Sequence, residues 1–142
     1  MIDFRLAGPA LALGFSAIGA AIGCGIAGII SHGIMSRIEE GHGKLIGLSA
    51  APASQMIFGF ILMLALRNAV MEGTVSPMSS AFIGGASGVA ICITAIYQGL
   101  ACASAIQATA RQPSVFGKTF IAIGVLESFG LFAFVFALLL LK

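Results

Sequence analysis

Charged residues are scarce in this chain. Only 8% of its 142 residues are Asp, Glu, Lys or Arg, whereas hydrophobic residues make up 59%. Soluble domains carry about 25% charged residues, so this chain cannot cover a water-facing surface. The net charge of +2 is too small and too dispersed to form a basic stripe for nucleic acid. The composition therefore predicts a membrane protein with no nucleic-acid partner.

Sequence features typical of substrate, nucleotide or metal binding are also scarce. There is no Trp and only one Tyr, so a substrate cavity with aromatic walls is not expected. No nucleotide-binding loop occurs, because the nearest sequence, Gly117 to Thr119, lacks the upstream glycine and opens a predicted membrane helix. The three cysteines show no paired spacing and are interpreted as small buried residues. We therefore expect no catalytic site in this chain.

Four long apolar runs separate the charged clusters. Each reaches the roughly 20 residues that cross the hydrocarbon core, and none alternates as a membrane strand does. The first run is about twice as long as the 7 to 15 apolar residues of a signal peptide, so a membrane span is the favoured interpretation. The sequence predicts an all-α membrane protein with helices at Leu6–Ser36, Leu45–Leu66, Ser79–Ala110 and Thr119–Leu141.

Four spans place the loops 38–44 and 111–118 on one side and both termini on the other. The positive-inside rule favours cytoplasmic loops, by four cationic residues to three. This margin is narrow. The four on the loop side are Arg37, Lys44, Arg111 and Lys118, against Arg5, Arg67 and Lys142 opposite.

The two halves of the chain are similar to each other. When position 1 is aligned with position 75 without a gap, Arg37 meets Arg111, and Gly43 and Lys44 meet Gly117 and Lys118. We predict one membrane domain, 1–142, made of two tandem helical hairpins, 1–74 and 75–142. Glu127 meets Ala53 in this internal alignment, so only the second hairpin carries a buried acid.

Small residues are concentrated in the first and third predicted helices. They allow helix backbones to approach closely, so we expect these two helices to form an inner layer. The second and fourth helices are rich in bulky residues and are expected to face lipid. The first helix has more glycines than one pairwise contact needs, which predicts a closed oligomer packed on both flanks. These glycines are Gly8, Gly14, Gly19, Gly23, Gly25, Gly28 and Gly33.

Glu127 lies about 13 Å from the loop end of a helix about 34 Å long, near mid-membrane. An isolated charge there costs at least about 2.5 to 3.5 kcal/mol on insertion scales. No Lys or Arg of the chain lies at that depth. Two states of Glu127 remain possible. The residue is either a protonated carboxyl that is hydrogen-bonded to a neighbouring helix or a carboxylate that holds a cation, and the cation pathway is the favoured interpretation.

Further polar residues share this depth. Gln55 and Gln98 lie about 16 and 19 Å from the loops. Pro52 has no N–H for the carbonyl of Leu48, so we expect a loosened turn with available carbonyl oxygens. Each polar residue alone is more often a helix-to-helix contact. Together, however, Glu127, Gln55, Gln98, Ser54 and a backbone carbonyl would supply about five oxygen ligands.

This pattern resembles the proteolipid subunit, called c or K, of V-type ATPases, with the bacterial and archaeal V/A type closest in size. The resemblance covers essentially the whole chain. It is carried by the duplicated Gly-rich hairpin, by Glu127 between Leu126 and Ser128, by the run Pro52 to Gln55 and by the step Tyr97 to Gly99.

The resemblance implies a plasma-membrane rotor ring of identical subunits. In that family the hairpin loops meet a central-stalk subunit on the cytoplasmic side, where Glu39 and Glu40 would be available for contact. Each glutamate carries one ion past a half-channel stator subunit that contains an arginine. ATP chemistry then belongs to partner subunits.

The resemblance also implies Na⁺ ligands, namely Glu127, Ser54, Gln55, Gln98 and the carbonyl of Ala51. One position departs from the sodium-binding members, which have a Tyr where this chain has Phe58. A ring that carries only H⁺ is therefore the alternative ion assignment. A small cation-coupled secondary transporter or channel is the alternative function, and a structural membrane spacer is the third.

Overall fold

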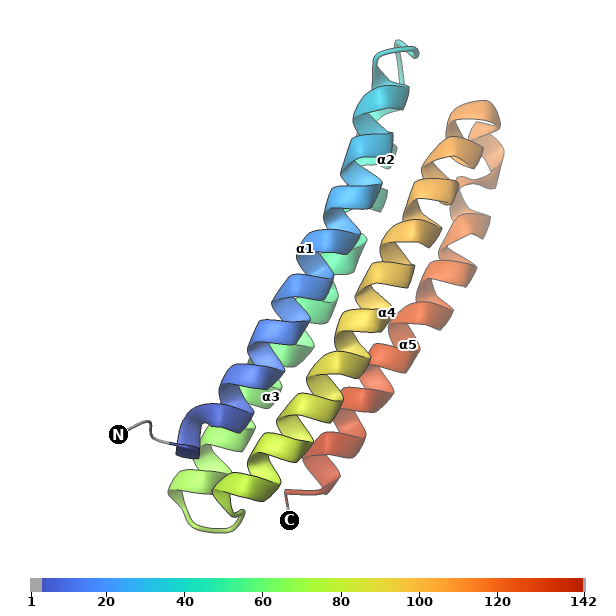
Figure 1. Ribbon diagram of the computed structural model, residues 1–142. Helices are drawn as coiled ribbons and strands as arrows, with labels where there is room; N and C mark the ends of the chain where they lie inside the picture. Colours follow the sequence, from blue (N-terminus) through green and yellow to red (C-terminus); the bar gives the residue numbers. More distant parts are fainter. Residues whose placement is uncertain (1–3, 142) are drawn as a thin grey trace.

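The computed structural model describes residues 4–141, which form four long helical segments. These segments pack into a bundle (Figure 1). The 3-10 turn Phe4–Leu6 leads into α1 (Ala7–Met35). The second segment comprises α2 (His42–Ala50), the 3-10 turn Ala51–Ala53 and α3 (Ser54–Met71). α4 (Pro77–Arg111) is followed by the turn Pro113–Val115 and α5 (Phe116–Leu139). All four segments are long and apolar enough to span a membrane, which confirms the predicted all-α class.

The segments alternate in direction. The connection from α1 to α2 and that from α4 to α5 lie at one end of the bundle, and the turn from α3 to α4 lies at the other (Figure 1). This is the predicted arrangement of two hairpins. Lys142, which entered the charge comparison, lies outside the described residues.

The predicted loops were too long. Lys44 lies inside α2 and Lys118 inside α5, while α3 continues past Arg67 to Met71. A charged residue ends an apolar run, but it does not interrupt backbone hydrogen bonding. The left-handed backbone at Gly41 (φ 83°) marks the connection from α1 to α2, and that at Gly73 (φ 78°) marks the turn from α3 to α4.

α1 and α4 pack backbone against backbone. A Cβ at Gly19 would overlap the backbone of Cys92, and one at Gly23 would overlap the carbonyl of Ala95. On the opposite helix, a Cβ at Gly99 would overlap the backbone of Gly23. The expected close approach of the first and third membrane helices is therefore confirmed, while their place in the inner layer of an oligomer stays a prediction.

Other glycines of α1 point away from the rest of the chain. Nothing lies within 4 Å of a Cβ built at Gly14, Gly25, Gly28 or Gly33. These four glycines, the open flank of α1, leave a small-residue surface with no partner among residues 4–141. They fit the predicted packing on both flanks, while the oligomer itself stays a prediction.

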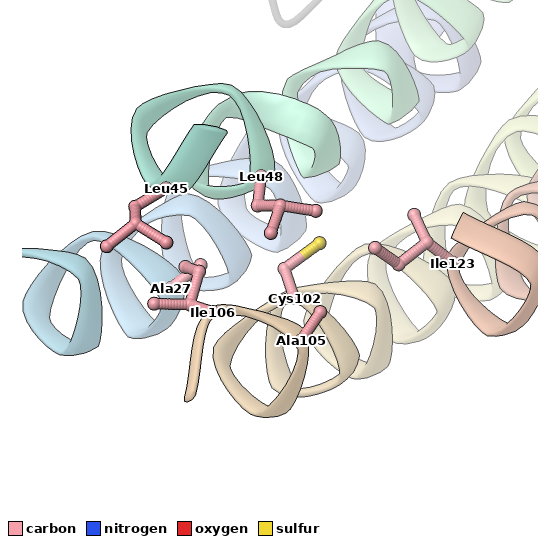
Figure 2. Close-up of a cluster of buried hydrophobic side chains, with 7 residues drawn as sticks. All are labelled: Ala27, Leu45, Leu48, Cys102, Ala105, Ile106 and Ile123. Carbon is pink, nitrogen blue, oxygen red and sulfur yellow. The ribbon is translucent and has the colours of Figure 1, made fainter. Parts of the chain in front are cut away.

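Two apolar clusters form the core at different heights. Figure 2 shows the one nearer the loops, where Leu48 of α2, Cys102 of α4 and Ile123 of α5 meet. The other gathers Ala12, Leu62, Leu66, Ile91 and Ala137 toward the opposite end. The clusters leave a layer between them in which Gln55 and Gln98 are buried.

Not all aromatic residues of the second and fourth membrane segments face outward. Phe132 and Phe136 of α5 are 51% and 60% exposed, as expected for lipid-facing side chains. Phe58 of α3 and Phe134 of α5, however, stack on each other with ring centroids 5.7 Å apart. The expectation that the bulky residues of both helices face lipid was thus wrong for this pair, because the α3–α5 interface also needs apolar filling.

Candidate polar site in the middle of the bundle

Pro52 interrupts the second membrane segment, as predicted, but the result is a tight turn. The backbone N–H of Ala51 donates to the carbonyl of Leu48, and the 3-10 turn Ala51–Ala53 follows. The Ala51 carbonyl accepts the backbone N–H of Ser54 and, at 3.1 Å, its hydroxyl. Two of the predicted oxygen ligands, from Ala51 and Ser54, are therefore adjacent at the break.

Gln55, at the start of α3, reaches across to the second hairpin. Its Nε2 donates to Oε1 of Gln98 on α4 over 3.2 Å. Both side chains are 0% exposed. The structure thus brings together the two glutamines that the sequence places at similar depth.

Thr94 also belongs to this cluster. Its hydroxyl lies 2.8 Å from the carbonyl of Ile91 and 3.4 Å from Oε1 of Gln55. On the other side of the pair, Nε2 of Gln98 is buried and has no hydrogen-bond partner among the described residues. An unpaired buried N–H group costs about 1–3 kcal/mol, so this arrangement is incompletely satisfied.

α5 closes the site through Gly130. A Cβ at this position would overlap Oε1 of Gln55, so only glycine admits the carboxamide against the α5 backbone. Glu127 lies one turn earlier on α5 and is half-buried. Glu127 lies within electrostatic range of Cys102, one turn beyond Gln98 on α4.

Glu127 is not in hydrogen-bond contact with the two glutamines. Within residues 4–141 its carboxylate has no hydrogen-bond or ion-pair partner. The structure therefore brings four of the predicted ligands, Ala51, Ser54, Gln55 and Gln98, to the α3–α4 side of the site. The fifth, Glu127, stands on the adjoining turn of α5.

The first hairpin has other residues at the positions that correspond to Gln98 and Glu127. In the internal alignment of the two hairpins, Cys24 corresponds to Gln98 and Ala53 to Glu127. The Cys24 thiol lies beside the backbone of Ala53. The two hairpins thus share one framework, but Gln98 and Glu127 of the second hairpin have no polar counterpart at Cys24 and Ala53 of the first.

The residue types limit what this site binds. No group of three or more His, Cys, Asp or Glu side chains that could hold a metal occurs in the described part of the chain. The candidate ligand atoms in the cluster are amide, hydroxyl and carbonyl oxygens, beside one carboxylate. Such oxygens suit hard cations and not soft transition metals.

Thr94 and Gly130 were missed by sequence reasoning. Thr94 precedes Gln98 by four residues and Gly130 follows Glu127 by three, so each shares a helix face with a predicted ligand. That spacing was a usable signal. It does not, however, tell which neighbouring helix the face meets.

The fold and the site define a membrane protein of two similar hairpins, with Glu127 and the buried pair of Gln55 and Gln98 near the middle of the bundle. The chain belongs to the ATP synthase C-subunit family, whose model matches it twice, over residues 7–66 and 81–140. The second range repeats the first at the offset of the internal alignment, so the family unit is one hairpin.

The chain is also similar to the K subunit of the A-type ATP synthase of Methanocaldococcus jannaschii. The two are 32% identical over 134 residues. The matched region covers 94% of this chain and 60% of the relative, so the chain spans about three-fifths of that protein's length.

Proposed function

We propose that this chain is the ion-carrying rotor-ring subunit of a rotary ATPase or ATP synthase of the V/A type. Each copy would carry one Na⁺ on Glu127. Membership of the C-subunit family and the similarity to an A-type K subunit support the rotor assignment. The ATP chemistry would belong to partner subunits.

The observation that carries the sodium assignment is the buried Gln55–Gln98 pair. A proton carrier needs one carboxyl and an acceptor, whereas two fully buried carboxamides with an unpaired N–H are costly without a further function. Coordination of a cation uses their oxygens. Proton carriage on Glu127 alone is the alternative that the experiment below tests.

The proposed mechanism follows from the charge of Glu127. With Na⁺ bound, the carboxylate is neutralised and passes the lipid; without Na⁺, it needs a polar half-channel and an opposing positive charge. An arginine of a stator subunit would supply that charge. Each elementary charge that crosses the membrane is worth about 2.3 kcal/mol per 100 mV, which couples rotation to the membrane potential.

In the proposed assembly, separate surfaces of the chain contact the neighbouring copy and the central stalk. The open flank of α1 would contact the next copy in the ring. The connection from α1 to α2, with exposed Glu39 and Glu40, would face the cytoplasm and meet the central stalk. The ring would lie in the plasma membrane and be surrounded by lipid.

Hydrophobic carbodiimides test this proposal, because they react with a protonated carboxyl and not with a cation-bound carboxylate. Labelling of Glu127 should fall as Na⁺ is added at fixed pH. Protons compete for the same carboxylate, so the protective Na⁺ concentration should decrease as pH rises. Labelling that follows pH alone, without Na⁺ protection at high millimolar levels, would identify a proton carrier.

Substitutions localise the effect. Gln55→Ala or Gln98→Ala should abolish Na⁺ protection, because each removes a ligand oxygen. Gln107→Ala is the matched control, since Gln107 lies on α4 but is exposed. Equal loss of protection in all three variants would contradict the assignment of the buried pair.

A further inference from the structure

We propose that Thr94 is a positioning residue of the ion site, whose hydroxyl selects the orientation of the Gln55 carboxamide. This inference rests on the proposed function, in which Gln55, Gln98 and Glu127 hold Na⁺. It assigns a role to a residue that is not itself expected to touch the ion.

The Thr94 hydroxyl has one hydrogen and two nearby acceptors. The shorter contact, 2.8 Å to the carbonyl of Ile91, takes that hydrogen, and 3.4 Å separates the hydroxyl from Oε1 of Gln55. With the hydrogen committed to Ile91, the remaining lone pairs of Thr94 face the Gln55 carboxamide. A lone pair in that position is best matched by an N–H donor.

Rotation of both carboxamides by half a turn supplies this donor. The ends of an amide have nearly the same shape, so the rotation needs little space. Nε2 of Gln55 then donates to Thr94, and Nε2 of Gln98 donates to Oε1 of Gln55. The N–H group that lacks a partner in the structure becomes satisfied.

The two orientations differ in what they present to an ion. In the structure the unpaired atom is Nε2 of Gln98, a donor that repels a cation. After rotation the unpaired atom is Oε1 of Gln98, a cation ligand. The first orientation thus suits an empty site and the second a loaded one, and only the second uses Thr94 as an acceptor.

The internal duplication supports this assignment independently. In the internal alignment, Thr94 corresponds to Ala20, just as Gln98 corresponds to Cys24 and Glu127 to Ala53. At this position the hydroxyl is therefore present only in the hairpin that carries Gln98 and Glu127. A threonine needed merely for helix packing would have no reason to follow this distribution.

The test measures the Na⁺ concentration that half-protects Glu127 from carbodiimide at fixed pH in the assembled protein. Thr94→Val keeps the shape and removes the hydroxyl, so this concentration should rise about tenfold, as expected for one lost hydrogen bond. Thr94→Ser should stay within about threefold of wild type, because it retains the hydroxyl. Thr94→Ala, which copies the first hairpin, is the second variant if valine disturbs assembly.

Thr109→Val is the control. Thr109 is also buried on α4, with a hydroxyl that has no partner among the described residues, but it lies about 22 Å from Thr94 along the helix. It should leave Na⁺ protection unchanged. The pH dependence of labelling without Na⁺ should be unchanged in the Thr94 variants, since the hydroxyl does not contact the carboxyl.

The outcomes separate the two proposals. Na⁺ protection that is the same in wild type, Thr94→Val and Thr94→Ala would overturn the role of Thr94 alone. So would a serine variant as weak as the valine variant. If wild type shows no Na⁺ protection, the sodium assignment fails and the role of Thr94 fails with it.

Discussion

Glu127 is an acid held among apolar helices with nothing in the described chain to neutralise it. Substitution by Gln removes a charge whose burial is unfavourable, so Glu127→Gln should fold and assemble normally. Ion transport and the ATP turnover coupled to it should be lost. Flux into vesicles that contain the complete complex measures the first, and native gels measure assembly. Flux near the wild-type level would show that another group carries the ion.

Gly130 gives a prediction about the shape of the site. A methyl group there must displace the Gln55 carboxamide. Gly130→Ala should therefore destabilise the chain by about 1–3 kcal/mol and weaken Na⁺ protection of Glu127. Gly124→Ala, on the same helix with open space around it, is the control. Similar stability and Na⁺ protection in the two variants would mean that the close contact is unimportant.

The candidate site was only partly predictable at the scale of residues. Helical rise alone placed Gln55 and Gln98 at one depth, and the structure confirms that they meet. The role of Thr94 was not predictable, because it depends on the rotation of α4 relative to α3. The same limit applies to Phe58, whose stacking on Phe134 depends on how α5 is placed.

At the scale of elements, the contact between α1 and α4 should be the most sensitive to added volume. Gly23→Ala brings a methyl group onto the carbonyl of Ala95, whereas Gly25→Ala has open space within the chain. We expect the first variant to lower the unfolding free energy by about 1–3 kcal/mol or more and the second to have little effect.

Unfolding by a denaturing detergent, followed by loss of helical signal, measures this difference. Phe132→Leu on α5 should behave like Gly25→Ala, because the Phe132 side chain is 51% exposed and stacks on Phe136 of the same helix. If Phe132→Leu were the most damaging of the three, the assignment of the closely packed layer would be reversed.

Membrane spans were predictable as elements because hydrocarbon thickness sets their minimum length. The ends of the helices were not predictable, because the apolar run stops at the first charged residue, whereas the helix stops where the backbone turns. Arg67 illustrates the difference, because it ended the predicted span and yet lies inside α3. The break at Pro52 was predictable, since proline lacks the required N–H.

At the scale of the whole molecule, the glycines of α1 fall into two groups with different expected phenotypes. Gly25→Leu or Gly28→Leu should leave the four-helix chain folded but prevent ring formation, because nothing in residues 4–141 lies within 4 Å of a Cβ at either position. Gly23→Leu should disrupt the chain itself.

Sizing in mild detergent, combined with a measure of helix content, distinguishes these cases. Wild type should elute as a large, heat-resistant ring and the Gly25 and Gly28 variants as small folded species. A wild-type dimer would favour the alternative of a secondary transporter. A full-sized ring in the leucine variants would place the interface between copies elsewhere.

The backbone contact between α1 and α4 also has a mechanical consequence. Side chains between helices act as compliant spacers, because they change rotamer under load, but at Gly19, Gly23 and Gly99 no such spacer exists. The two hairpins are therefore joined stiffly, as expected of close-packed interiors that transmit strain. If the chain turns in a ring as proposed, a sideways force on Glu127 would pass from α5 to α4 and on to α1 with little elastic loss, and the whole chain would move as one rigid body.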